Sequence, residues 1–255
     1  MARTERAFRT DAIILKRRDF NEADRLLTVF TPKHGKIDVI AKGARKPTST
    51  KAGHVELFTR VDMLIHRGRD FGILSQAEMV EPFLALRDDL QRGAYASYAA
   101  ELVDRFTGSE DEDQRHLYNL LDSTLQRLCE EDDLRLVIRY FEIHLLGLAG
   151  FQPELNECVI GREPVMPEDQ YFSYVEGGVI CVRHAVRTGQ LIDLPMVTLK
   201  LLRHMQRSPF SKVRSLKVAS NLHEDAERIL LGYITFLLER RLESVDFIRR
   251  LRQET

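Results

Sequence analysis

The residues best suited to bind a ligand form one basic stretch, which reads GKIDVIAKGARKPTSTK from Gly35 to Lys51. Its positive charges are Lys36, Lys42, Arg45, Lys46 and Lys51, and no acidic residue follows Asp38. Lysine and arginine displace the counterions of nucleic acids, while hydroxyl and backbone N–H groups bond phosphate oxygens without reading bases. The stretch therefore predicts a phosphate-binding segment. A merely solvated basic loop is the alternative that the residue types leave open.

Single-stranded nucleic acid also needs aromatic side chains on which its bases stack. The aromatic candidates in the first 80 residues are Phe8, Phe20, Phe30, His34, Phe58, His66 and Phe71. We expect most of them to lie in a core. Phe58 alternates with Leu57 along a predicted strand, so both burial and exposure for stacking remain open for it.

The acidic and basic residues are unevenly distributed along the 255-residue chain. Residues 1–80 contain 16 Lys/Arg and 10 Asp/Glu, whereas the remainder contains 22 basic and 29 acidic side chains. A basic part within a chain of net charge -1 suggests nucleic-acid contact by that part. We find no glycine-rich phosphate loop of a nucleotide hydrolase, so the sequence predicts binding rather than nucleotide hydrolysis.

Composition indicates a globular protein of a reducing compartment. No apolar run approaches the length of about 18 residues that a membrane-spanning helix needs. The N-terminus is charged from its third residue, and the three cysteines do not form a disulfide framework. We therefore expect a cytoplasmic protein without membrane contact.

Two kinds of periodicity divide the chain. Period-two hydrophobic patterns predict strands at residues 12–15, 26–30, 36–41, 55–66 and 71–80. Five short strands in about 70 residues favour a small closed barrel of the oligonucleotide-binding (OB) type. The basic residues from Lys42 to Lys51 would then project from a mobile loop between strands, because Gly43 and Pro47 exclude regular structure there.

Helical periodicity begins after Glu81-Pro82. Helices are predicted around residues 95–106, 117–128, 134–148, 197–205 and 224–242, and the first three are expected to pack together in a bundle. The acidic turn at 108–113 separates the first two. The fold class is thus α+β and multidomain: an OB-fold barrel at 1–80, a helical domain at 81–150 and 188–255, and an insert of turns and short strands at 151–187. We expect the last residues, IRRLRQET, to form a frayed tail.

Residues 8–49 contain three distinctive motifs: the Asn21-Glu22-Ala23-Asp24-Arg25 segment, Gly35-Lys36 and the run from Ala41 to Lys46. With these motifs, residues 8–49 resemble the RecO family of bacterial DNA repair and recombination mediators. The segment LLGLAGFQP, which ends at Pro153, also looks like the family. The resemblance covers nearly the whole chain.

The resemblance implies an OB fold, a helical domain and a zinc-ribbon-like insert. It also implies a protein of the RecF pathway that is not an enzyme. Such a protein binds single- and double-stranded DNA, anneals strands coated with single-stranded-DNA-binding protein, and helps its partner RecR to load RecA. The C-terminal tail of single-stranded-DNA-binding protein would dock on the helical domain, and the protein would be associated with the nucleoid. The family's basic OB surface maps onto Lys36, Lys42, Arg45 and Lys46.

The insert departs from the family pattern of two C-x-x-C pairs. Its pairs read Cys158-Val159-Ile160-Gly161 and Cys181-Val182-Arg183-His184, which leaves three ligands where a closed zinc site needs four. We therefore predict a degenerate ribbon without metal or cofactor. Three ligands with an open position would suit a zinc-dependent enzyme, and the barrel alone would suit an OB-fold RNA-binding factor, so both remain alternatives.

Overall fold

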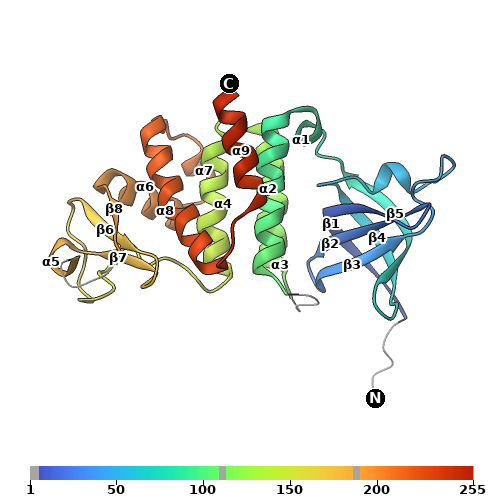
Figure 1. The fold of residues 1–255 in the computed structure, drawn as a ribbon, viewed down its shortest axis with the longest axis horizontal. Coiled ribbons are helices and arrows are strands. Elements are labelled where there is room, and N and C mark those ends of the chain that lie inside the picture. Colours follow the sequence, from blue (N-terminus) through green and yellow to red (C-terminus); the bar gives the residue numbers. More distant parts are fainter. Residues whose placement is uncertain (1–5, 109–112, 186–189, 255) are drawn as a thin grey trace, which may run out of the picture. The chain divides into compact units, whose positions relative to one another are not determined.

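A computed structural model describes residues 6–108, 113–185 and 190–254 (Figure 1). The chain forms two compact units. The first comprises residues 1–131 and 243–255, and the second comprises residues 132–242. The three predicted domain boundaries, after residues 80, 150 and 187, stay predictions. Most of the acidic turn predicted at 108–113 lies outside the described residues. Within the described ranges, every helix is too short or too polar to cross a membrane.

Five strands of the first unit close into a barrel, which confirms the predicted OB-fold class. The strands are β1 (Ala7–Phe20), β2 (Asp24–Thr31), β3 (Gly35–Ala41), β4 (Arg60–His66) and β5 (Gly72–Glu81). Their order is β1-β2-β3-β5-β4, and β4 pairs with β1 to close the barrel. Only the β3–β5 pair is parallel among these strand pairs. The barrel core is aliphatic and includes Ile14, Leu27, Val29, Val39, Val61, Met63 and Ile65.

Two predicted strands differ from the observed ones. β1 is longer than predicted, because its first half, up to Ile13, pairs with β4 and its second half, from Ile13 on, pairs with β2. The fourth strand begins at Arg60 rather than at residue 55, since Phe58 has a φ of 63° and interrupts the strand. The Phe58 backbone N–H donates to the Ile14 carbonyl at 2.9 Å. The Phe58 side chain is only 6% exposed, so it belongs to the core and is not a stacking platform.

Helices complete the first unit. They are α1 (Ala85–Asp88), α2 (Leu90–Phe106), α3 (Arg115–Glu130) and α9 (Glu243–Glu254). Asp89 caps α2 by accepting hydrogen bonds from two backbone N–H groups of its first turn. The prediction of a frayed C-terminal tail is wrong. Residues 243–254 form α9, whose Ile248 is buried and whose Arg252 donates to the Tyr95 hydroxyl at 2.8 Å.

The second unit combines helices with a small sheet. Its elements are α4 (Leu134–Leu148), β6 (Gln170–Ser173), β7 (Gly178–Ile180), α5 (Val182–Ala185), β8 (Ile192–Leu194), α6 (Met196–Arg207), α7 (Phe210–Val213) and α8 (Ser220–Leu238). The sheet order is β7-β6-β8. Helix α4 packs with α6 and α8, so the predicted helical region is present but its helices are divided between two units. The zinc-ribbon character of the insert stays a prediction.

Candidate nucleic-acid interface

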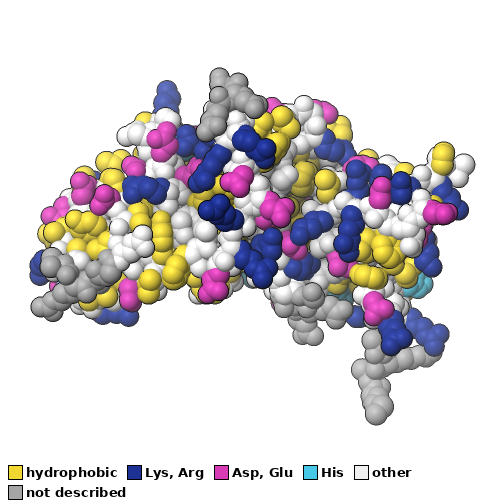
Figure 2. All heavy atoms as spheres, viewed as in Figure 1, with side chains coloured by type: hydrophobic (Ala, Val, Ile, Leu, Met, Phe, Trp, Pro, Cys, Tyr) yellow, Lys and Arg dark blue, Asp and Glu magenta, His cyan; other side chains and the backbone are white. Residues whose placement is uncertain are grey.

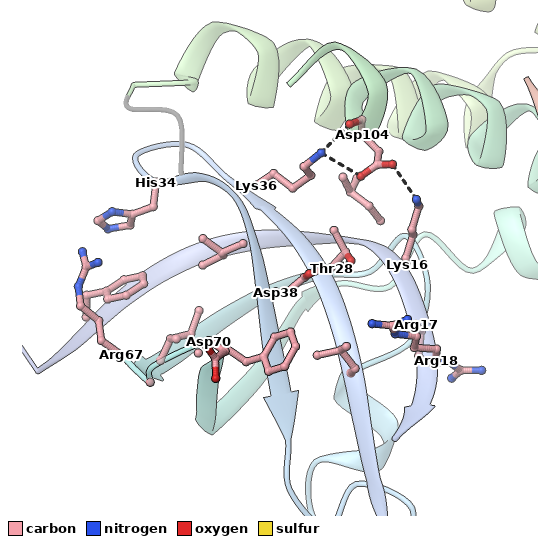
Figure 3. A pocket seen from close by; sticks show the side chains of 18 of the residues that line it. Lys16, Arg17, Arg18, Thr28, His34, Lys36, Asp38, Arg67, Asp70 and Asp104 are labelled. Carbon is pink, nitrogen blue, oxygen red and sulfur yellow. Dashed lines mark hydrogen bonds and ion pairs between the residues drawn. The ribbon is translucent and has the colours of Figure 1, made fainter. Parts of the chain in front are cut away.

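A cleft of about 940 Å³ opens on the barrel and is bordered by one helical residue, Asp104 of α2 (Figure 3). Its lining contains seven basic side chains and three acidic ones. The basic residues are Lys16, Arg17, Arg18, Lys33, Lys36, Arg67 and Arg69. Lys and Arg side chains are also spread over the visible face of the barrel in Figure 2. A concave basic surface attracts phosphates and concentrates their field.

Strand ends and one tight turn position these charges. β1 places Lys16, Arg17 and Arg18 beyond a register shift between Ile14 and Lys16. The β4–β5 turn places Arg67 and Arg69 on either side of Gly68. A Cβ at residue 68 would lie 2.0 Å from the Phe71 carbonyl oxygen, so this turn requires glycine.

Aromatic rings line the cleft beside the charges. The rings of Phe8 and His34 have centroids 4.2 Å apart, and the Arg67 guanidinium carbon lies 5.2 Å from the Phe8 centroid. Phe71 also lines the cleft and meets Phe20 edge-on at 6.2 Å. Phe8 and Phe71 are partly exposed, so the cleft offers both phosphate partners and faces for base stacking.

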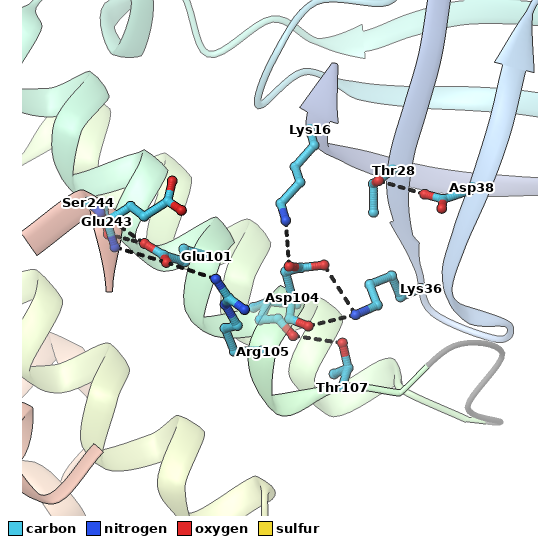
Figure 4. Close-up of polar contacts among 11 residues, drawn as sticks. Lys16, Thr28, Lys36, Asp38, Glu101, Asp104, Arg105, Thr107, Glu243 and Ser244 are labelled. Atoms are coloured by element: carbon cyan, nitrogen blue, oxygen red, sulfur yellow. Dashed lines mark hydrogen bonds and ion pairs between the residues drawn. The ribbon is translucent and has the colours of Figure 1, made fainter. Parts of the chain in front are cut away.

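Two of the lysines are held by one carboxylate (Figure 4). Asp104 accepts hydrogen bonds from Lys16 at 2.6 Å, and its other oxygen lies 3.1 Å from the Lys36 ammonium. Lys36 also donates to the Asp104 backbone carbonyl at 2.6 Å. Burial alone would raise the pKa of Asp104, but the hydrogen bonds and charges of Lys16 and Lys36 outweigh it and hold the pKa below its ordinary value. This carboxylate therefore neutralises charge on two of the cleft lysines.

The remaining cleft cations differ in how far they are neutralised. Arg17 forms an ion pair with Glu56, which also pairs with Arg25. Within the described parts of the chain, the exposed side chains of Arg18, Lys33 and Arg69 form no ion pair. These three charges are available to a ligand without breaking an internal contact.

The structure separates the predicted basic residues into groups. Lys36 lines the cleft, whereas the β3–β4 connection carries Lys42, Arg45, Lys46 and Lys51 outside its lining. Arg45 pairs with Asp19 at 3.3 Å, and Lys51 donates to the Leu74 carbonyl at 3.1 Å.

Lys42 and Lys46 are exposed, and no ion pair of theirs occurs among the residues that the structure describes. The connection is ordered by turns and a short 3-10 helix, Ala52–His54, and Gly43 with a φ of 69° donates to the Asp24 carboxylate. The sequence pattern did not predict Lys16 to Arg18, Lys33, Arg67 or Arg69 as site residues. Two signals, the basic run at 16–18 and the Arg67-Gly68-Arg69 turn, could have identified all of these except Lys33.

Three side chains of the insert that could bind a metal ion lie close together in the second unit. The ligand atoms of Cys158, Cys181 and His184 are within 4.8 Å of one another. His184 Nδ1 is 3.5 Å from Cys158 Sγ and 3.1 Å from Cys181 Sγ. Burial raises the pKa of the Cys158 thiol, but hydrogen bonds from nearby backbone N–H groups outweigh it and lower the pKa to about 7. Gly161 contributes no ligand, so these three residues alone leave a tetrahedral site one donor short.

Comparisons with known proteins agree over both units. A family model described as "Recombination protein O N terminal" matches residues 4–83, and one described as "Recombination protein O C terminal" matches residues 87–246. The chain is 35% identical to a protein named DNA repair protein RecO from Desulforamulus reducens, with 96% of this chain and 94% of that protein covered. It is 37% identical to a protein of the same name from Roseiflexus sp., with 98% and 87% covered.

Proposed function

Because the chain belongs to the RecO family of DNA repair proteins, we propose that it binds single- and double-stranded DNA in the barrel cleft and anneals complementary strands. It acts by binding and is not an enzyme. The observation that carries this proposal is the cleft itself, in which seven cations surround partly exposed aromatic rings. The cations suit phosphates, and the rings suit the bases of an unpaired strand.

Annealing follows from charge neutralisation. Two DNA strands repel each other because both are negatively charged. A protein that neutralises phosphates on both strands raises their effective concentration, and it needs no nucleotide hydrolysis to do so. The cleft cations hold one strand, led by Arg18, Lys33 and Arg69, which form no internal ion pair within the described residues. The exposed Lys42 and Lys46 of the β3–β4 connection are placed to meet further phosphates, together with Arg45 and Lys51 after local rearrangement. Lys36 contributes when phosphate replaces Asp104 as its partner.

Membership of the family also supports a proposal about binding partners. We propose that the chain binds RecR and the C-terminal tail of single-stranded-DNA-binding protein, and that it helps to load RecA in the RecF pathway of recombination after DNA damage. The protein then works in the cytoplasm at the nucleoid. Mixing the purified chain with RecR or with the tail peptide in a calorimeter tests each contact directly, and a peptide without its terminal residues is the control.

Annealing of complementary oligonucleotides, with and without bound single-stranded-DNA-binding protein, tests the central proposal. One variant reverses the cleft charges (Arg18→Glu/Lys33→Glu/Arg69→Glu), and another reverses the loop charges (Lys42→Glu/Arg45→Glu/Lys46→Glu). A matched control reverses three exposed lysines of the second unit (Lys200→Glu/Lys212→Glu/Lys217→Glu).

The native chain and the control should accelerate annealing, and the cleft variant should not. For single-stranded DNA, losing three phosphate contacts should reduce the slope of log affinity against log salt by about 2. If all four proteins annealed the strands at the same rate, the cleft would be excluded as the surface that binds DNA. Tighter binding of RNA than of DNA of the same sequence would instead support the RNA-binding alternative, and hydrolytic turnover that depends on zinc would support the enzymatic one.

A further inference from the structure

The barrel cleft contains a carboxylate that no cation neutralises. Asp38 of β3 lines the cleft together with seven basic side chains, and it is exposed. Among the residues that the structure describes, Asp38 forms no ion pair, and Lys36 on the same strand is held by Asp104 instead. A carboxylate repels phosphates, so the backbone of a bound strand should avoid this position. The position suits a part of the ligand that donates hydrogen bonds.

The neighbouring strand fixes the Asp38 carboxylate. Thr28 of β2 is the cross-strand partner of Asp38, and both alternate with the core residues Val29 and Val39, so their side chains lie on the outer face of the barrel. The Thr28 hydroxyl donates to Asp38 Oδ1 at 2.6 Å (Figure 4). Because this bond uses the hydroxyl proton, the pair presents only acceptor oxygens to the cleft.

An aromatic ring occupies the next position across the barrel. Val39 of β3 pairs with Gly72 of β5, and Asp38 and Phe71 each come one residue before this pair. Gly72 permits the close approach of the two strands, because a Cβ there would lie 2.9 Å from the Val39 side chain and 2.8 Å from that of Ile65. Phe71 lines the cleft and is partly exposed. A base that stacks on this ring has its edge beside the Asp38 carboxylate.

The four DNA bases differ in how well their edges match two adjacent acceptors. Guanine has two neighbouring donors on its Watson–Crick edge, N1–H and the N2 amino group, which match the two oxygens of one carboxylate. Cytosine and adenine each have one amino group there, beside an acceptor nitrogen. Thymine has a single N–H between two carbonyl oxygens, which acceptors repel. The match is therefore best for guanine and worst for thymine.

We propose that Asp38, oriented by Thr28, hydrogen-bonds one unpaired base of the bound strand and selects guanine over thymine at that place. The proposal rests on the proposed function, because it requires single-stranded DNA in the cleft. Asp70 is less suited to this role, since it lies in the β4–β5 turn and no hydrogen bond or ion pair holds its carboxylate within the described ranges. The surrounding cations contact phosphates, which are the same in every sequence.

The test measures binding of the full chain to short labelled oligothymidylates in which isolated thymines are replaced by guanine or by hypoxanthine. Isolated guanines avoid guanine quadruplexes, and hypoxanthine keeps N1–H but lacks the N2 amino group. We expect the guanine oligonucleotide to bind at least about fivefold more tightly than plain oligothymidylate, with hypoxanthine between them. The salt slope should be the same for all three, because a base contact releases no counterions.

Variants assign the preference to individual residues. Asp38→Asn should still bind DNA but lose the preference, because an amide suits thymine as well as guanine. Asp70→Asn is the matched control: it removes the same charge from the same cleft and should keep the preference. Thr28→Val should weaken the preference by freeing the carboxylate, and Thr28→Ser should retain it.

The outcomes separate this proposal from the proposed function. If the native chain binds none of the oligonucleotides, the proposed function fails and this proposal fails with it. If the chain binds all three equally, DNA binding stands and base selection is overturned. A preference that persists in Asp38→Asn, or that is lost in Asp70→Asn, overturns the assignment to Asp38. Full preference in Thr28→Val overturns the role of Thr28, and a salt slope that differs between the oligonucleotides attributes the preference to phosphates and overturns base selection.

Discussion

Replacing Asp104 with asparagine separates two roles of the cleft lysines: stabilising the fold through their contacts with Asp104, and binding the phosphates of DNA. Asp104 is 14% exposed and holds Lys16 and Lys36, which would otherwise face the cleft. Asparagine keeps the shape of the side chain but loses its charge. The Lys36 bond to the residue-104 backbone carbonyl survives the change, so Lys16 is released more completely than Lys36.

The expected effects have opposite signs for DNA affinity and for stability. The substitution makes one or two additional lysines available to phosphates. The slope of log affinity against log salt should therefore become steeper by about 0.7–1.4 for single-stranded DNA. The Lys36 contact is mostly buried and charge-assisted, whereas Lys16 is half exposed and its ion pair contributes little. We therefore expect the free energy of unfolding to fall by about 1–2 kcal/mol.

Titration of labelled single-stranded DNA across a salt series measures the slope, and urea denaturation measures the stability. Asp38→Asn is the matched control, because Asp38 lines the same cleft and accepts from Thr28 at 2.6 Å rather than from a lysine. Both variants remove one negative charge. If their salt slopes are equal, Asp104 does not compete with phosphate for the lysines, and the reasoning is refuted.

The pH dependence of the Asp104 contact has a definite sign. Its pKa in the folded protein is lower than the ordinary value of 3.8, so the ionised form is stabilised by folding. The contribution is complete above pH 3.8 and is lost as the pH falls through the lower folded pKa. The stability difference between the native chain and Asp104→Asn should therefore be constant from pH 5 to 8 and shrink under more acidic conditions.

Three further changes test other parts of the structure. Phe71→Ala should weaken binding of single-stranded DNA by about 1–3 kcal/mol while leaving the salt slope unchanged, and a changed slope would argue against stacking. Glu101→Ala removes the acceptor of the Ser244 N–H and hydroxyl at the start of α9, and should destabilise the first unit by about 1–2 kcal/mol in denaturant. Asp133→Ala removes the N-cap of α4, which accepts a hydrogen bond from the Leu136 N–H, and should lower the free energy of unfolding by about 1–2 kcal/mol at neutral pH. Burial raises the pKa of Asp133, but the hydrogen bonds that it accepts from His223 and Leu136 outweigh burial and lower the pKa. The loss of stability should therefore be smaller below pH 3.8.

The barrel could be predicted from the sequence because each strand has one face that must be buried. Alternation along Val61, Met63 and Ile65 gives this face directly, and all three side chains are in the barrel core. The start of β4 could not be found in this way. The positive φ of Phe58 depends on backbone bonding to Ile14, a residue far away in the sequence, and no local pattern reports such a contact.

The candidate site was less predictable for a related reason. The density of positive charge along the sequence predicts a site in the run from Lys42 to Lys51. Most of the cations that line the cleft instead come from β1, the β2–β3 turn and the β4–β5 turn. Such a site becomes visible only when the barrel closes. The bonds of Arg45 and Lys51 to backbone carbonyls likewise depend on folding, and composition cannot distinguish a cation held by the protein from one open to a ligand.

The return of α9 to the first unit has a consequence for synthesis. Residues 132–242 must leave the ribosome before α9 can reach α2, and at about 5–20 residues per second this takes on the order of 5–20 s. During that interval the nascent first unit lacks the contacts of Ile248 and Arg252. Its barrel strands are already complete, but the side of α2 that contacts α9 stays uncovered. A chain cut short before residue 243 would keep that side of α2 uncovered permanently, so its first unit would lack the contacts of α9 for as long as it exists.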